Sequence, residues 1–395
     1  MASGTTTAAH SARRSVVDKL GVLIAAIIAA GWVFLPFATF RANRIVPGAS
    51  RNVFDALPLP EALLLAAVIG ISLAVVFFRT PTLWRLLVSF VALLVLLVLI
   101  GHSATFLTPK GNTLARVAPG AGFWVLMFGL GLMAADALTR LRLKPWPRIG
   151  ILALVALAIA VLLLSGAWHD LSILKEYSNR ADVFWREGAN HIFLAFGSLL
   201  AATVIGVPVG ILCHRLPRLR AVTLNVLNAI QTIPSIALFG LLIAPLAWFA
   251  AHVPGATAIG ISGIGAAPAL VALFFYSLLP VVANTVVGLA NVPEDANDAA
   301  RGMGMTDRQR LSAIELPLAF PVILTGIRIV LVQNIGLATI AALIGGGGFG
   351  VFVFQGIGQT AMDLVLLGAV PTVGLAFAAA IVLDAVVEMV RAGHG

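Results

Sequence analysis

Residues 291–321 read NVPEDANDAARGMGMTDRQRLSAIELPLAFP, a polar stretch between two long apolar runs. A proline and two acidic residues near its start suit the first turn of a helix. Gly302 and Gly304 supply a break, and the spacing of Thr306 and Gln309 is typical of a capping box that begins a second helix. We expect that second helix to stop before Pro317. The stretch therefore predicts two short helices joined by a glycine turn.

The composition around this stretch is that of a membrane protein. Of the 395 residues, 60% are hydrophobic and only 10% are charged, and the mean hydropathy is +1.05. Soluble domains carry about 25% charged residues. These values exclude a soluble enzyme, a disordered chain and a secreted domain built on disulfides, since there is only one cysteine. The net charge of +9 is spread over short loops, which favours membrane orientation over nucleic-acid binding as its explanation.

Ten segments are long and apolar enough to cross a bilayer as helices, which requires about 20 residues each. We therefore predict an all-α, polytopic protein with about ten transmembrane helices. The expected spans are Leu20–Phe40, Glu61–Phe78, Thr82–Gly101, Pro119–Leu138, Ile149–Ser165, His191–Cys213, Thr223–Ala250, Pro268–Ala290, Val322–Leu343 and Leu364–Val390.

The distribution of Lys and Arg predicts the orientation. When both termini are placed in the cytoplasm, the inner loops hold twice as many basic residues as the outer loops, as the positive-inside rule requires. Residues 1–19 then form a cytoplasmic tail. Residues 291–321 also face the cytoplasm, where a projecting pair of helices suits docking to a partner.

The chain divides into two parts near residue 190. Residues 20–165 form additional N-terminal helices of plain apolar character, and the polar residues 166–190 are expected to form an external linker. Residues 191–395 place Asn and Gln side chains inside the predicted spans. Because polar groups inside a membrane cost free energy and tend to face a bundle interior or a water-filled path, the second part is the expected working part.

The stretch 291–321 resembles the "EAA" coupling signature of ABC importer permeases, which reads Glu-Ala-Ala, then Gly, then Ile-x-Leu-Pro at fixed spacings. Asp298 replaces the signature glutamate and retains its charge. The matching residues are Asp298, Ala299, Ala300, Gly304, Ile314, Leu316 and Pro317.

The resemblance implies a type I ABC importer transmembrane domain in residues 191–395. In that family the loop docks in a groove on an ATP-binding subunit, and closure of the subunit drives alternating access. The implied partners are this ATP-binding subunit, a second permease copy or homologue, a solute-binding protein outside, and the lipid bilayer of a bacterial cytoplasmic membrane. The chain is not expected to be an enzyme or to hold a cofactor or metal. It lacks a G-x-x-x-x-G-K-[ST] loop, so ATP and Mg are expected on the partner chain.

Three flanking stretches look like osmoprotectant permeases, which import glycine betaine, choline or similar quaternary ammonium compounds. These stretches are NAIQTIPS at 228–235, PVVANT at 280–285 and IGGGGFG at 344–350. Permeases for methionine or another amino acid share much of this architecture and form the alternative. A lipid-modifying enzyme would need clustered acid, base or metal-binding residues at one membrane face, and a channel or secondary transporter would need no ATPase.

Five residues are candidates for the translocation path. They are Gln231, Pro234, Tyr276, Asn284 and Asn334. Four are polar groups or helix breaks inside spans, which often serve function. The tyrosine is a candidate because a quaternary ammonium could rest on its aromatic face by cation–π attraction, with packing or interface anchoring as the alternative. A structural kink is an equal explanation for Gln231 and Pro234, and interhelical hydrogen bonding is favoured for the two asparagines.

Overall fold

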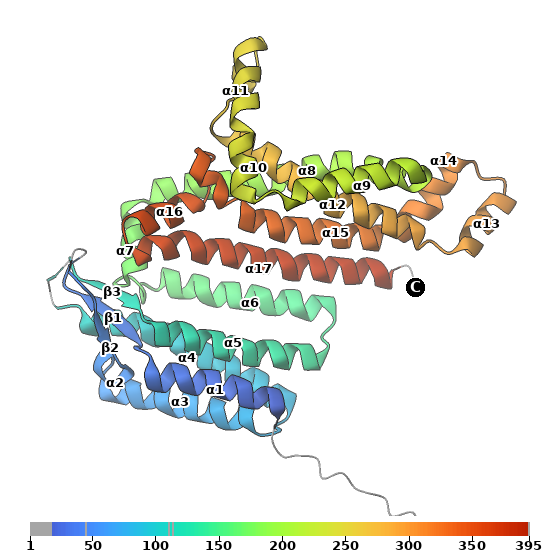
Figure 1. Cartoon of the computed structure of the whole chain (residues 1–395). Helices are drawn as coiled ribbons and strands as arrows, with labels where there is room; N and C mark the ends of the chain where they lie inside the picture. The colour runs from blue at the N-terminus through green and yellow to red at the C-terminus, as the bar shows by residue number, and fades with distance from the viewer. Residues whose placement is uncertain (1–17, 44–45, 110, 113, 394–395) are drawn as a thin grey trace, which may run out of the picture. The chain divides into compact units, whose positions relative to one another are not determined.

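The computed structural model describes residues 18–43, 46–109, 111–112 and 114–393. The expected cytoplasmic tail thus lies almost wholly outside the described residues. The chain forms two compact units, Met1–Leu143 with Ile159–Leu174 and Lys144–Ala158 with Lys175–Gly395. We call them the N-terminal unit and the C-terminal unit (Figure 1).

The described residues contain nine helices long and apolar enough to cross a membrane, and a shorter apolar helix at Lys19–Phe34. The polytopic helical fold predicted from the sequence is confirmed. The seventh expected span, Thr223–Ala250, is not one helix. It falls on α9 (Pro217–Thr232), α10 (Ser235–Leu241) and α11 (Ile243–His252). The chain breaks before Pro234, because the residue preceding a proline disfavours helical backbone.

The N-terminal unit packs its helices around one apolar core. Its elements are α1 (Lys19–Phe34), β1 (Ala38–Arg41), β2 (Ala49–Arg51), α2 (Val53–Ala56), α3 (Leu59–Phe77), α4 (Thr82–Leu107), β3 (Arg116–Pro119) and α5 (Ala121–Leu141). α6 (Pro145–Leu164) contributes residues to both units. Helix α5 packs against α1 and α4.

A small antiparallel sheet, in the order β2-β1-β3, is an addition to the predicted all-helical architecture. Ala38 pairs with Arg51 on one side and with Pro119 on the other. The first expected span ran to Phe40, but α1 ends at Phe34 and strand β1 follows. Leu35, which precedes Pro36, is extended, with φ −118° and ψ 144°, as the steric demand of the proline ring requires.

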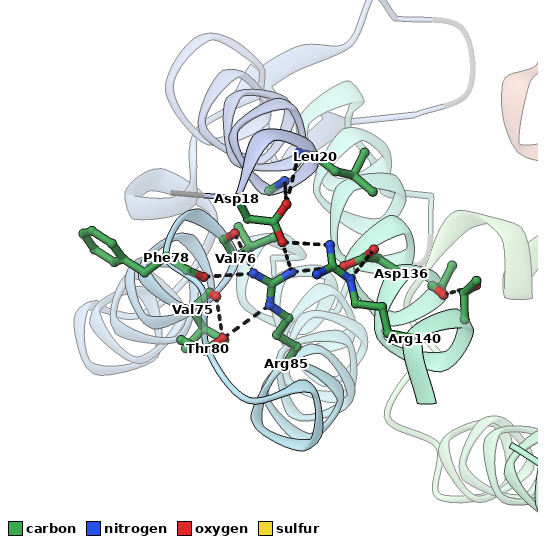
Figure 2. A network of polar contacts seen from close by, with 12 residues as sticks. Asp18, Leu20, Val75, Val76, Phe78, Thr80, Arg85, Asp136 and Arg140 are labelled. Carbon is green, nitrogen blue, oxygen red and sulfur yellow. Dashed lines mark hydrogen bonds and ion pairs between the residues drawn. The ribbon is translucent and has the colours of Figure 1, made fainter. Parts of the chain in front are cut away.

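A buried charge cluster joins α1, α4 and α5 in the N-terminal unit (Figure 2). The Arg85 side chain is 1% exposed, and its Nη1 lies 2.8 Å from Asp18 Oδ2 and 3.1 Å from Asp136 Oδ2. Arg140 pairs with the same two carboxylates at 2.7 and 2.8 Å. Arg85 Nη2 also donates to the carbonyl of Phe78 at 2.9 Å. The two guanidinium groups and the two carboxylates thus neutralise one another, which offsets the cost of removing their charges from water.

The C-terminal unit consists mainly of long helices packed side by side. Helix α7 (Ser172–Asn179) contributes residues to both units. The other elements of the C-terminal unit are α8 (Ala181–Arg215), α9, α10, α11, a 3-10 turn η1 (Thr257–Ile259), α12 (Ala266–Ala290), α13 (Glu294–Gly302), α14 (Asp307–Arg310), a π-helical turn η2 (Leu311–Glu315), α15 (Leu316–Leu337), η3 (Ile340–Ile344), α16 (Gly350–Gly358) and α17 (Met362–Ala392). The expected linker 166–190 is largely helical, since α7 and the start of α8 fall within it.

Helices α8, α12 and α15 form the centre of this unit, with α12 packed against both of the others. Small residues allow close approach of the backbones. A Cβ atom at Gly210 of α8 would lie 2.5 Å from the Thr285 Cβ of α12, and one at Gly326 of α15 would lie 2.7 Å from the Asn284 Cβ. Helix α11 has no buried residue and stands away from this centre (Figure 1).

Candidate functional site

The segment 291–321 contains two short helices, α13 and α14, which lie beyond the end of α12, followed by the turn η2 and the first residues of α15 (Figure 1). We call it the coupling loop. Helix α13 ends in a Schellman turn: the N–H of Gly304 donates to the Arg301 carbonyl at 2.9 Å, and that of Met305 donates to the Ala300 carbonyl at 3.1 Å. Gly304 has φ +80°. This left-handed conformation favours glycine and explains the break predicted here. Gly302, predicted to share in the break, is instead the last residue of α13.

The predicted capping box is present at the start of α14. The Thr306 hydroxyl accepts from the Gln309 N–H at 3.4 Å, and Gln309 Oε1 accepts from the Thr306 N–H at 2.8 Å. Two backbone donors that a helix start leaves unpaired are therefore partly satisfied within the loop. The loop has a fixed local shape without help from a partner.

The prediction that the second helix stops before Pro317 is wrong. The chain continues from α14 through the π-helical turn Leu311–Glu315 directly into α15. A proline is tolerated in the first turn of a helix, where its missing N–H costs nothing, and the wider π turn precedes it. The coupling loop is consequently continuous with the long helix α15.

The seven residues that match the coupling signature fall into an exposed and an inward-facing group. Asp298, Ala299 and Gly304 are exposed. Asp298 lies 3.3 Å from Arg301, a pair open to solvent. Met303, which the sequence analysis did not select, is 69% exposed at the turn beside Gly304. An exposed apolar side chain at the tip of a polar loop suits contact with another protein.

The inward-facing group holds the loop to the bundle. Ala300 is fully buried, and Ile314 and Pro317 are half-buried. Leu316 packs against the apolar cluster formed by Leu289, Val292, Ala319 and Ile323. The signature thus combines a face open for contact with residues that fix the loop to α12 and α15.

Glu315 was missed by sequence reasoning, although it lies inside the signature. Its side chain is 5% exposed, and it lies 3.0 Å from Arg310 and 2.7 Å from Arg215. Arg215 is the last residue of α8. A single acidic residue between Ile314 and Leu316 gives no sequence signal of a partner about a hundred residues away.

Gln231 and Tyr276, predicted separately, are direct partners. Pro280 has no N–H, so the carbonyl of Tyr276, four residues earlier in α12, lacks its helical donor. The Gln231 side-chain amide donates to this carbonyl at 2.8 Å. In return the Tyr276 hydroxyl donates to the carbonyl of Ile233, next to the break at Pro234. The break at Pro234 and the proline site inside the continuous helix α12 therefore satisfy one another's backbone groups.

The two candidate asparagines have different surroundings. Asn334 is fully buried, and its amide donates to the hydroxyls of Ser198 at 2.8 Å and Ser277 at 2.9 Å. It thus joins α15 to α8 and α12. Asn284 donates at 2.8 Å to the carbonyl of Pro280 in its own helix. The interhelical bonding favoured for both asparagines is present for Asn334, whereas the bond recorded for Asn284 lies within α12.

An ionic cluster lies near the C-terminal end of α17. Asp384 pairs with Arg328 of α15 and, at 3.1 Å, with Arg148 of α6, which also lies 3.0 Å from Glu388. Among the described residues, no group of three or more His, Cys, Asp or Glu side chains is placed to hold a metal ion.

Two family models match the chain. One, described as the N-terminal domain of the ABC transporter permease YehY, matches residues 18–174. The other, the binding-protein-dependent transport system inner membrane component, matches residues 203–392. The coupling loop lies within the second match.

Curated relatives resemble the second part of the chain. The osmoprotectant import permease protein OsmW of Salmonella typhimurium is 43% identical over 45% of this chain and 78% of its own length. The choline transport system permease protein OpuBB of Bacillus subtilis is 37% identical over 50% and 82%. The carnitine transport permease protein OpuCB of Listeria monocytogenes is 36% identical over 47% and 78%. Among solved structures, a chain of the MetNI methionine ABC transporter is 23% identical over 53% and 95%, with a TM-score of 0.46. The chain is a multi-pass membrane protein and belongs to the osmoprotectant permeases of ABC importers.

Proposed function

We propose that this chain forms the membrane path of an ATP-driven importer for a quaternary ammonium osmoprotectant, such as glycine betaine, choline or carnitine. The observation that carries the proposal is the coupling loop, an exposed α13 and glycine turn continuous with the helix α15. The names of the relatives support the cargo class: they are osmoprotectant, choline and carnitine permeases. They favour this cargo over the alternative, methionine or another amino acid.

The loop geometry suggests how the chain receives energy from ATP. An ATP-binding partner would contact the exposed face that carries Asp298, Ala299 and Gly304. Because no break separates the π turn from α15, a displacement of the loop passes along that helix. Ile314, Leu316 and Pro317 fix the loop to the bundle. ATP and Mg are bound by the partner, and this chain moves in response.

The path residues act in this proposal at the joint between α9, α10 and α12. The break at Pro234 and the missing helical hydrogen bond at Pro280 of α12 are linked by Gln231 and Tyr276, and prolines are sites where helices kink. Asn284 and Asn334 lie on α12 and α15, the helices that are directly joined to the coupling loop. We assign the change of access to movement at this joint.

The complete importer contains further chains. An ATP-binding subunit sits at the loop, a second permease copy or a homologous permease completes the path, and a solute-binding protein delivers the cargo outside. The location is the bacterial cytoplasmic membrane, with both termini in the cytoplasm. This orientation places the coupling loop on the side where ATP is available.

The test is uptake of labelled glycine betaine in cells with and without this chain, with the partner subunits present in both. Unlabelled choline, carnitine, proline and methionine serve as competitors. We expect uptake that depends on the chain and is blocked by choline or carnitine. Uptake blocked by methionine alone, or no betaine uptake with all partners verified, would contradict the cargo assignment.

A further inference from the structure

Glu315 is the buried centre of a charge cluster where the coupling loop meets the bundle. Oε1 accepts a hydrogen bond from Arg310 Nε at 3.0 Å, and Oε2 accepts one from Arg215 Nη2 at 2.7 Å. Arg310 also lies 3.0 Å from Asp307. We call these four residues the Glu315 cluster. Both oxygens of one carboxylate are thus occupied by guanidinium groups from two separate parts of the chain.

The cluster is balanced, with two positive and two negative groups. The side chains of Glu315 and Arg310 are 5% and 6% exposed. A buried carboxylate is tolerated only when its charge is paired and its oxygens accept hydrogen bonds. Separation from Arg215, whose side chain is 34% exposed, would leave the buried Glu315 carboxylate with one guanidinium partner instead of two. Separation from Arg310 would leave two buried charges less well compensated. The cluster therefore resists being pulled apart when the loop moves.

The helices of the bundle differ in how they are joined to the coupling loop. Helices α12 and α15 flank it in sequence and are connected to it by the backbone. Helix α8 has no such connection. Its side chains Val207 and Ile211 pack against the apolar cluster beneath the loop. Its last residue, Arg215, makes the charged hydrogen bond to Glu315. Apolar contact is non-directional, whereas a charge-assisted hydrogen bond fixes a direction and a distance.

The π-helical turn brings the members of the cluster together. Glu315 is the last residue of this turn and lies five positions after Arg310, the spacing at which a π-helical turn closes its hydrogen bonds. In the coupling signature Glu315 occupies the unspecified position between Ile314 and Leu316. The signature itself therefore assigns this residue no role.

We propose that Glu315 is a positioning residue for energy coupling, which passes displacement of the coupling loop to α8 through Arg215. Helices α8 and α15 then move as one body when the ATP-binding partner closes. The inference rests on the proposed function, because it requires a partner that moves the loop. It goes beyond that function by naming the contact through which the third central helix is driven.

The test uses the complete importer, reconstituted in liposomes with its ATP-binding subunit and solute-binding protein. Arg215→Ala removes only the α8 side of the cluster and leaves the pair between Arg310 and Glu315 intact. We expect uptake of labelled glycine betaine per ATP hydrolysed to fall about tenfold, which is the scale of the effect when one charge-assisted hydrogen bond is lost. Assembly and ATP hydrolysis without solute stay at the wild-type level. Arg218→Ala, which alters an exposed arginine three residues away, is the matched control and keeps wild-type coupling.

Glu315→Gln and the double variant with Arg215→Ala provide the second measurement. If both residues act through their shared contact, the double variant loses no more coupling than the more affected single variant. Unchanged coupling in Arg215→Ala, losses that multiply in the double variant, or a parallel fall of assembly and basal hydrolysis would overturn the inference. A wild-type complex without ATP-dependent uptake would instead overturn the proposed function on which the inference rests.

Discussion

The hydrogen bonds that link the chain break after α9 to the Pro280 site of α12 lead to a stability prediction for Gln231. Gln231→Leu removes the amide that donates to the Tyr276 carbonyl at 2.8 Å. Pro280 cannot replace this donor, so the carbonyl is left unpaired inside the bundle. Interhelical hydrogen bonds in membranes contribute on average about 0.6 and at most about 1.7 kcal/mol. An unsatisfied buried acceptor costs about 1–3 kcal/mol. We expect Gln231→Leu to lower the free energy of unfolding by about 2 kcal/mol.

The same change should cost much less in a Pro280→Ala background. Alanine at 280 supplies a backbone N–H to the Tyr276 carbonyl, as in an unbroken helix. We expect the cost of Gln231→Leu to fall to about 0.5 kcal/mol or less there, within the range of an ordinary exposed substitution. Unfolding in mixed micelles with increasing SDS, followed by circular dichroism, gives all four corners of the double-mutant cycle. Equal costs in both backgrounds would refute the reasoning.

Two further substitutions test the packing of each unit, by the same unfolding measurement. In the N-terminal unit, Arg85→Ala leaves the carboxylates of Asp18 and Asp136 with one arginine instead of two. We expect the free energy of unfolding to fall by about 3 kcal/mol, the lower end of the range for a broken buried ion pair. The control Lys19→Ala, at an exposed position, should change it little. Equal effects of the two substitutions would show that the cluster is dispensable. In the C-terminal unit, Asn334→Leu removes two interhelical hydrogen bonds and should cost about 1–3 kcal/mol. No loss would mean that the bonds from the Ser198 and Ser277 hydroxyls to carbonyls of their own helices suffice without Asn334.

Local patterns in the sequence predicted the parts of the fold that depend on local chemistry. The apolar runs gave the helices, because a bilayer leaves few other structures for them. The glycine turn and the capping box of the coupling loop were predictable because their hydrogen bonds join residues only a few positions apart. Gly304 and Thr306 accordingly have the structures that their sequence spacing indicates.

The remaining features depend on contacts between distant residues. The sequence predicts one span through Pro234, because sequence alone does not show that Tyr276 stabilises the separated ends of α9 and α10. The role of Glu315 could not be predicted from the sequence, since its partner Arg215 lies on another helix. The π turn allows the helix to continue through Pro317, although local rules predict that the helix ends before this proline. In each case tertiary contacts override a local rule.

Two glycine variants, compared in the uptake assay, directly test whether the coupling loop transmits energy from the ATP-binding partner. Gly304→Asp places a charge at the tip of the coupling loop, and Gly255→Asp makes the same change in a loop outside it. Both glycines have positive φ, +80° and +83°, and a Cβ atom at either would meet nothing within 4 Å. The backbone strain is therefore matched, at about 1–2 kcal/mol. We predict that Gly304→Asp abolishes glycine betaine uptake at normal membrane abundance while Gly255→Asp retains it. Undiminished uptake by Gly304→Asp would contradict coupling through this loop.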